Sequence, residues 1–205
     1  MKEPGYSMSF CGASLSVHAM VQVAKVFLEE GEDPDRVKER VLAQNLLQSR
    51  NQRSQQRIFQ EIRLRLQALS TSEKHYLVRA PLGEQKMLCW IAVCRSYPFV
   101  AEFAQKVLGT RFSEASPRLQ HADFDAFFYA SAQTHPALET LRLSTQKKLR
   151  QVLFRMMREA GFLEKGGSIL PLFPDESLFK ALEPDHLSEL RWLPVSPSLS
   201  RRWVP

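Results

Sequence analysis

The chain has 205 residues, of which 44% are hydrophobic and 24% are charged. These ordinary globular values exclude wholesale disorder. The length allows one domain or two small ones whose core needs no stabilising disulfide or metal ion. The formal net charge is +6 and the pI is near 9.4, which indicates an anionic partner without deciding among DNA, RNA and membrane headgroups.

The cysteines and the apolar runs limit the compartment. Cys11, Cys89 and Cys94 form no C-x-x-C pair, so we expect buried thiols in a reducing, cytoplasmic setting. The first nine residues are mixed and polar, which predicts no signal peptide. The most apolar run, 87–94, ends at Arg95, whereas a spanning helix needs about 20 apolar residues. We therefore expect no membrane contact.

Helical periodicity recurs along the whole chain and predicts a mainly all-α fold, a multi-helix bundle. Ser14 or Ser16 is expected to cap the first helix, and Asp33 followed by Pro34 the second. The helix over 84–95 is apolar nearly all round, which marks it as the central, buried one. The predicted helices span 17–30, 34–47, 54–69, 73–79, 84–95, 98–108, 122–132, 145–160, 176–182 and 185–192.

The helix over 145–160 is the most strongly marked, with Ser144 as its expected cap and Gly161 as a left-handed stop. Two short apolar arms, 162–163 and 168–170, then flank a Gly-Gly turn and predict a small β-hairpin. A capped helix followed by a hairpin is typical of a winged helix-turn-helix. An ordinary helix packed on a two-stranded flap fits the same pattern.

Changes in composition suggest three regions. We predict an N-terminal helical bundle over 1–112, a C-terminal helical region over 118–175 that ends in the hairpin, and short helices with a Pro/Ser-rich tail over 176–205. The polar stretch 110–120 is the expected boundary between the first two.

The positive charge is concentrated in two stretches. Residues 36–68 hold eight basic and two acidic residues, and residues 144–160 hold five and one. At about 100° per residue, one arc of each helix gathers the bases while the opposite side is apolar. Such rows point to a polyanion, although helices often carry solvated basic faces that pair with acids elsewhere. The candidate nucleic-acid contacts are Arg50, Arg53, Arg57, Lys147, Lys148, Gln151, Arg155, Arg158 and, on the wing, Lys165.

No pattern for catalysis stands out. The five histidines show no metal-ligand spacing, and the sequence has no phosphate-binding loop or nucleophile elbow. Asp123 and Asp125 resemble a metal pair, but acids are also favoured in the first turn of a helix. We expect no enzyme activity, no cofactor, no metal and no small-molecule substrate.

Several segments taken together resemble the BrxA family of bacterial BREX anti-phage systems. They are Tyr6 to Phe10, Val41 to Leu47, Trp90 to Arg95 with Phe99 and Phe103, Asp123 to Phe128, and Ser144 to Leu163. The resemblance covers about residues 6–175. It implies a NusB-like helical fold, association with double-stranded DNA and work beside other BREX proteins, and it implies no catalytic residue.

We therefore expect a non-catalytic DNA-binding accessory protein of phage defence, with duplex DNA and other BREX proteins as partners. Two alternatives stay open. One is an RNA-binding protein of the NusB type, and the other is a structural subunit whose basic faces dock an acidic BREX partner.

Overall fold

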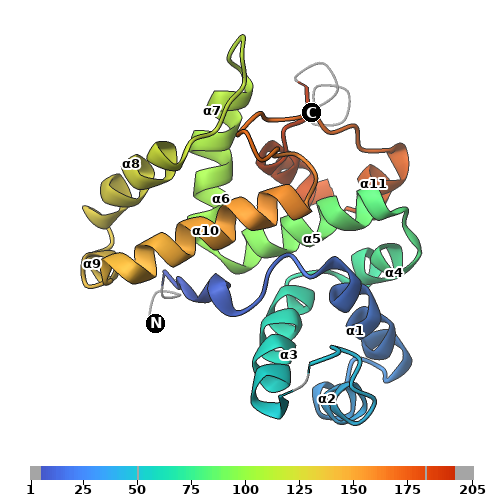
Figure 1. Ribbon diagram of the computed structural model, residues 1–205. Coiled ribbons are helices and arrows are strands. Elements are labelled where there is room, and N and C mark those ends of the chain that lie inside the picture. Colours follow the sequence, from blue (N-terminus) through green and yellow to red (C-terminus); the bar gives the residue numbers. More distant parts are fainter. Residues whose placement is uncertain (1–5, 50, 183, 197–205) are drawn as a thin grey trace.

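The computed structural model describes residues 6–49, 51–182 and 184–196, and it is mainly helical, as predicted (Figure 1). The α-helices are α1 Val17–Glu29, α2 Pro34–Ala43, α3 Gln52–Gln67, α4 Thr71–Arg79, α5 Leu82–Ser96, α6 Pro98–Phe103, α7 Gly109–Phe112, α8 His121–Ala132, α9 Pro136–Glu139, α10 Leu143–Glu159 and α11 Glu176–Ala181. Two further segments are 3₁₀ helices, η1 Ser9–Gly12 and η3 Pro184–Trp192, and one is a π-helix, η2 Ala104–Leu108.

Helix α5 is the buried centre of the fold, as its uniformly apolar sequence predicts. Trp90 is fully buried, its indole nitrogen donates to the carbonyl oxygen of Trp192 at 2.9 Å, and its ring meets Phe162 edge-on at 5.1 Å. Helices α1 to α4 pack below α5 in Figure 1, α6 to α8 rise above it, and α10 runs alongside it. The central helix thus joins the two halves of the chain.

Short-range signals fix several helix ends. The Asp33 carboxylate accepts from the backbone nitrogens of Asp35 and Arg36, Ser70 and Glu73 form a capping box, and Gly161 has a φ of +90°. The cap predicted at Ser144 is wrong. Helix α10 begins at Leu143, because Arg142 is the last extended residue, and no side-chain bond caps it.

Two other boundaries also differ from prediction. Helix α2 ends at Ala43 and not at 47, since Asn45 and Gln48 adopt positive φ angles and turn the chain. The helix that starts at Pro98 continues to Phe112 through the π-helix. Within the described ranges, no single helix is long and apolar enough to cross a bilayer. Helix α5 and the helix over 98–112 pass that test only as a pair, bent by 116°.

The predicted β-hairpin does not form as two strands. Leu163 and Ile169 make one isolated antiparallel bridge, and the Glu164 nitrogen donates to the Ser168 carbonyl at 3.0 Å. The arms are too short for a ladder, because Gly161 ends the helix only two residues earlier. The second arm also pairs with the 117–119 loop, where the Ile169 nitrogen donates to the Pro117 carbonyl at 3.0 Å.

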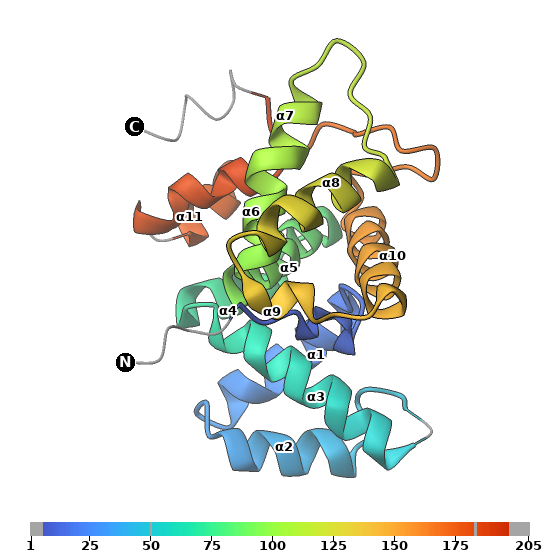
Figure 2. The ribbon, with the colours of Figure 1, turned by 90° about the vertical axis from the view of Figure 1, so that its left-hand side faces the viewer.

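The buried apolar side chains form one connected cluster that runs from Phe10 to Val195. It draws on all three regions predicted from composition. The boundaries placed at 112 and 175 stay predictions. Helices α8 and α9 and the start of α10 lie on the side of the fold that faces the viewer in Figure 2.

Candidate nucleic-acid interface

Helix α3 presents one of the two predicted basic faces. Asn51 starts the helix by accepting from the backbone nitrogens of Arg53 and Ser54. The side chains of Arg53 and Arg57 are exposed, while Phe59, Ile62 and Leu66 on the other side are buried in the core. The third arginine predicted here, Arg50, lies outside the described residues.

Helix α10 presents the other basic face. Its apolar side is buried against α5, which fixes the rotation of the helix about its axis. The helix therefore turns one polar arc to solvent, as the periodicity predicts. The exposed side chains of this arc are Lys147, Lys148, Gln151, Arg155 and Arg158.

The N-terminal turn η1 lies between these two faces and brings them together. Cys11 of η1 lines a pocket of about 450 Å³ together with Arg57. Burial raises the pKa of the Cys11 thiol, while the positive charges of Lys148 and Arg155 pull that pKa back down. Cations from both helices thus lie around one short segment. We call Arg53, Arg57, Lys147, Lys148, Arg155 and Arg158 the basic face.

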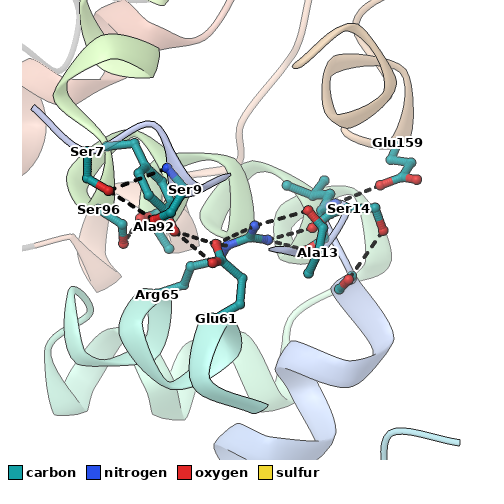
Figure 3. Close-up of polar contacts among 12 residues, drawn as sticks. Ser7, Ser9, Ala13, Ser14, Glu61, Arg65, Ala92, Ser96 and Glu159 are labelled. Carbon is teal, nitrogen blue, oxygen red and sulfur yellow. Dashed lines mark hydrogen bonds and ion pairs between the residues drawn. The ribbon is translucent and has the colours of Figure 1, made fainter. Parts of the chain in front are cut away.

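A buried ionic network holds the α3 side of this face in place. Arg65 is fully buried, its Nη2 atom lies 2.8 Å from a carboxylate oxygen of Glu61, and Tyr97 donates to both oxygens of Glu61 at 2.7 Å. The Nη1 atom of Arg65 donates to the carbonyl oxygen of Ser14 at 2.6 Å. Figure 3 shows this guanidinium between α3 and the N-terminal segment. Arg65 therefore ties α3 to residues 13–15.

The same segment is held from the α10 side. The Glu159 carboxylate accepts from the backbone nitrogen of Leu15 at 2.7 Å (Figure 3). Its other oxygen lies 3.9 Å from Nε of Arg155. Segment 13–15 is thus a strut between the two basic helices. Because both ends are fixed by charge-assisted hydrogen bonds, the separation of the two faces is set by the fold.

Part of the positive charge counted in the sequence is neutralised inside the protein. Arg36 pairs with Asp33, Arg40 with Glu29 and Glu30, and Arg65 with Glu61. Arg150 pairs with Asp125 of α8 and leaves the exposed arc. The described contacts contain no ion pair for Arg53, Arg57, Lys147, Lys148, Arg158 or Lys165. The basic face therefore holds five of the cations that the described contacts leave without an ion pair, and others, such as Lys38, Arg118 and Arg142, lie elsewhere on the surface.

Lys165 is exposed on the turn beyond the C-terminal end of α10, apart from the η1 contact region. Arg118, which sequence reasoning missed, lies beside it, because its Nη2 atom donates to the carbonyl oxygen of Gly166 at 2.9 Å. A second missed cation is Arg142, exposed at the start of α10. No local signal marks Arg118, whose place depends on a contact 48 residues away.

The aspartates that resemble a metal pair have structural partners. Asp123 accepts from the backbone nitrogen of Gln120 at 2.7 Å and from Arg111, and Asp125 pairs with Arg150. In the part of the chain that the structure describes, no three histidine, cysteine or acidic side chains gather into a metal-binding group. Cys89 and Cys94 are buried, as expected, and Cys11 is half-buried.

These features define an α-helical protein with a cationic face shared by two helices and fixed by a buried strut. A model of the BrxA family matches residues 4–185, and the chain belongs to this family. It is 25% identical to BREX protein BrxA of Escherichia coli O9:H4 (strain HS) over 64% of its own length. It is also 25% identical to BREX protein BrxA of Bacillus cereus (strain H3081.97), over 80% of this chain and 82% of that protein.

The match spans 63% of the length of the Escherichia coli relative. The fold is similar to that in a crystal structure of an uncharacterized protein from Magnetospirillum magneticum, with a TM-score of 0.80 and 18% identity. That alignment covers 94% of this chain and 99% of the other. At this identity, the likeness establishes the fold alone.

Proposed function

We propose that the protein is a non-catalytic accessory component of a BREX phage-defence system that binds double-stranded DNA along its basic face. The relatives named as BREX proteins support the system, and the geometry supports the ligand. The observation that carries the proposal is the convergence of Arg57, Lys148 and Arg155 around Cys11. Unpaired cations gathered on one surface repel one another, and a polyphosphate removes that repulsion.

In this proposal, α10 supplies the contact nearest the bases. Gln151 lies in the middle of its exposed arc, flanked by cations, and an amide at that place is suited to a base edge. Arg53 and Arg57 of α3 hold the backbone on the other side of the strut. Lys165 and Arg118 on the turn after α10 add backbone contacts, in the role that a wing takes in other DNA-binding proteins.

The test is a binding titration with a short duplex and charge-reversal variants. Lys148→Glu/Arg155→Glu should weaken binding at least about tenfold, because two phosphate contacts become repulsions. The matched control is Lys38→Glu/Arg79→Glu, which makes the same change in net charge at exposed positions on α2 and α4. Equal losses in both variants would overturn the proposal, since only bulk charge would then matter.

Competition separates the proposal from its alternatives. Duplex DNA should compete better than RNA or single-stranded DNA of the same length. Preferred binding of RNA favours the NusB-type alternative. A structural subunit that docks an acidic protein surface is favoured by two results together. Every nucleic acid then binds weakly, and a BREX complex is lost when Arg53 and Arg57 are changed to Glu.

A further inference from the structure

A second pocket lies at the N-terminal end of α10, lined by residues of α8, α9 and the first turn of α10. Its volume is about 420 Å³. Gln146 lines it from α10, one residue before Lys147 of the basic face. Glu159 and the strut to α3 lie at the other end of the same helix, so the pocket extends the basic face away from α3.

Aromatic rings form one wall of this pocket. Phe128 of α8 is buried, and the Tyr129 ring stands nearly perpendicular to it, at 87° with centroids 6.1 Å apart. Tyr129 is 58% exposed. An exposed tyrosine ring beside an apolar wall is a platform on which a flat heterocycle can stack.

Gln146, which lines the pocket, also has a hydrogen-bond donor without a partner. Gln146 is 5% exposed, and its amide nitrogen is buried without a hydrogen-bond partner. Buried amide donors in folded proteins nearly always have a partner, so this one marks a place where an acceptor is missing. The exposed side chains of Gln133 and Glu139, which also line the pocket, offer further polar groups.

We propose that this pocket receives one unstacked nucleobase of the nucleic acid whose backbone follows the basic face. The base would stack on Tyr129. The Gln146 side chain, whose amide nitrogen is shielded from solvent in the free protein, would turn to pair with an acceptor on the edge of the base. Lys147 and the first-turn amides of α10, which no side chain caps, would then meet the phosphate of the same nucleotide. This inference rests on the proposed function.

Three duplexes test it. They are identical except at the centre, where the first is fully paired, the second carries one extra unpaired adenine, and the third carries one extra abasic unit. The last two share a flexible backbone and differ only in the base. The wild type should bind the adenine bulge about tenfold more tightly than the abasic bulge, a difference of about 1.4 kcal/mol.

Two variants and a control complete the design. Tyr129→Ala should lower the affinity for the adenine bulge to that for the abasic bulge. Gln146→Leu should reduce the ratio of the two affinities, adenine bulge over abasic bulge, while thermal melting shows an intact fold. The control is Phe173→Ala, which removes an exposed ring outside the pocket and should leave the ratio unchanged. A wild-type ratio of one, or a full ratio in Tyr129→Ala, overturns the inference alone. Failure of every duplex to bind overturns the proposed function as well.

Discussion

The carboxylate of Glu159 accepts a 2.7 Å hydrogen bond from the backbone nitrogen of Leu15, and this contact joins the end of α10 to the segment that Arg65 holds against α3. The two helices with the basic face do not lie in direct contact along their lengths. They are positioned through residues 13–15, to which both helices are hydrogen-bonded. The geometry of the proposed interface therefore depends on buried polar groups that never touch the ligand.

Glu159 also lowers the positive potential of the basic face, because its second oxygen lies 3.9 Å from Nε of Arg155. Glu159→Gln keeps an oxygen for the Leu15 nitrogen and removes the charge. We expect the Kd for duplex DNA to fall about two- to fivefold, the range of a partly exposed ion pair. Glu29→Gln, which removes a charge near α2, is the control. An unchanged or higher Kd in Glu159→Gln contradicts the prediction.

Arg65→Met tests the buried end of the strut. It leaves the Glu61 carboxylate without its guanidinium, so we expect a loss of about 3–5 kcal/mol in the free energy of unfolding. Chemical denaturation measures it. The double variant Glu61→Met/Arg65→Met should recover part of this loss, because no unpaired carboxylate remains. A single variant as stable as the wild type would show that the network contributes nothing.

The turn after α10 offers a test of backbone geometry. Gly167 has a φ of +88°, and a Cβ there would lie 2.6 Å from the carbonyl oxygen of Leu119. Gly167→Ala should therefore destabilise the protein by more than about 1 kcal/mol. Gly166→Ala is the matched control, because nothing lies within 4 Å of its added Cβ. Similar melting temperatures for the two variants would contradict the described turn.

Glu84 predicts a pH dependence of stability. Burial raises the pKa of this carboxyl, although it accepts from Tyr76 and from the Asp175 nitrogen. A raised folded-state pKa means that the folded protein favours the protonated carboxyl. The contribution of Glu84 to the free energy of unfolding is therefore fully present at low pH and is lost as the pH rises through the folded-state pKa. Glu84→Gln should raise the Tm at pH 7 by roughly 1–2 °C and have no effect near pH 3. A lower Tm at pH 7 would contradict the prediction.

Local signals in the sequence predict the helices better than the site. The apolar stripes, the Asp33 cap and the Gly161 stop depend on residues a few positions apart, and each is confirmed. Arg65 shows where such reasoning fails. It belongs to the basic stretch by sequence, yet it is fully buried, while its neighbour Leu64 is 43% exposed. Only Glu61 is a local partner, and the carbonyl oxygens that Arg65 also binds lie about 50 residues away, so no local pattern marks its burial.

The same reason explains the other differences. The hairpin stays at a single bridge because its arms are short, and the second arm also pairs with the 117–119 loop through other backbone groups. The convergence of α3 and α10 depends on η1, whose sequence carries no charge. Periodicity predicts which side of each helix is basic, but the relation between the two sides follows only from the folded chain.

The salt dependence of duplex binding tests most directly whether both helices contact one duplex. With six to eight phosphates neutralised, log K against log salt should have a slope of about −5 to −7. Arg57→Gln on α3 and Lys148→Gln on α10 should each bring the slope about 0.9 closer to zero, and the double variant by the sum, while Lys38→Gln leaves it unchanged. A wild-type slope near zero, or a slope that responds to only one of the two helices, would contradict the account.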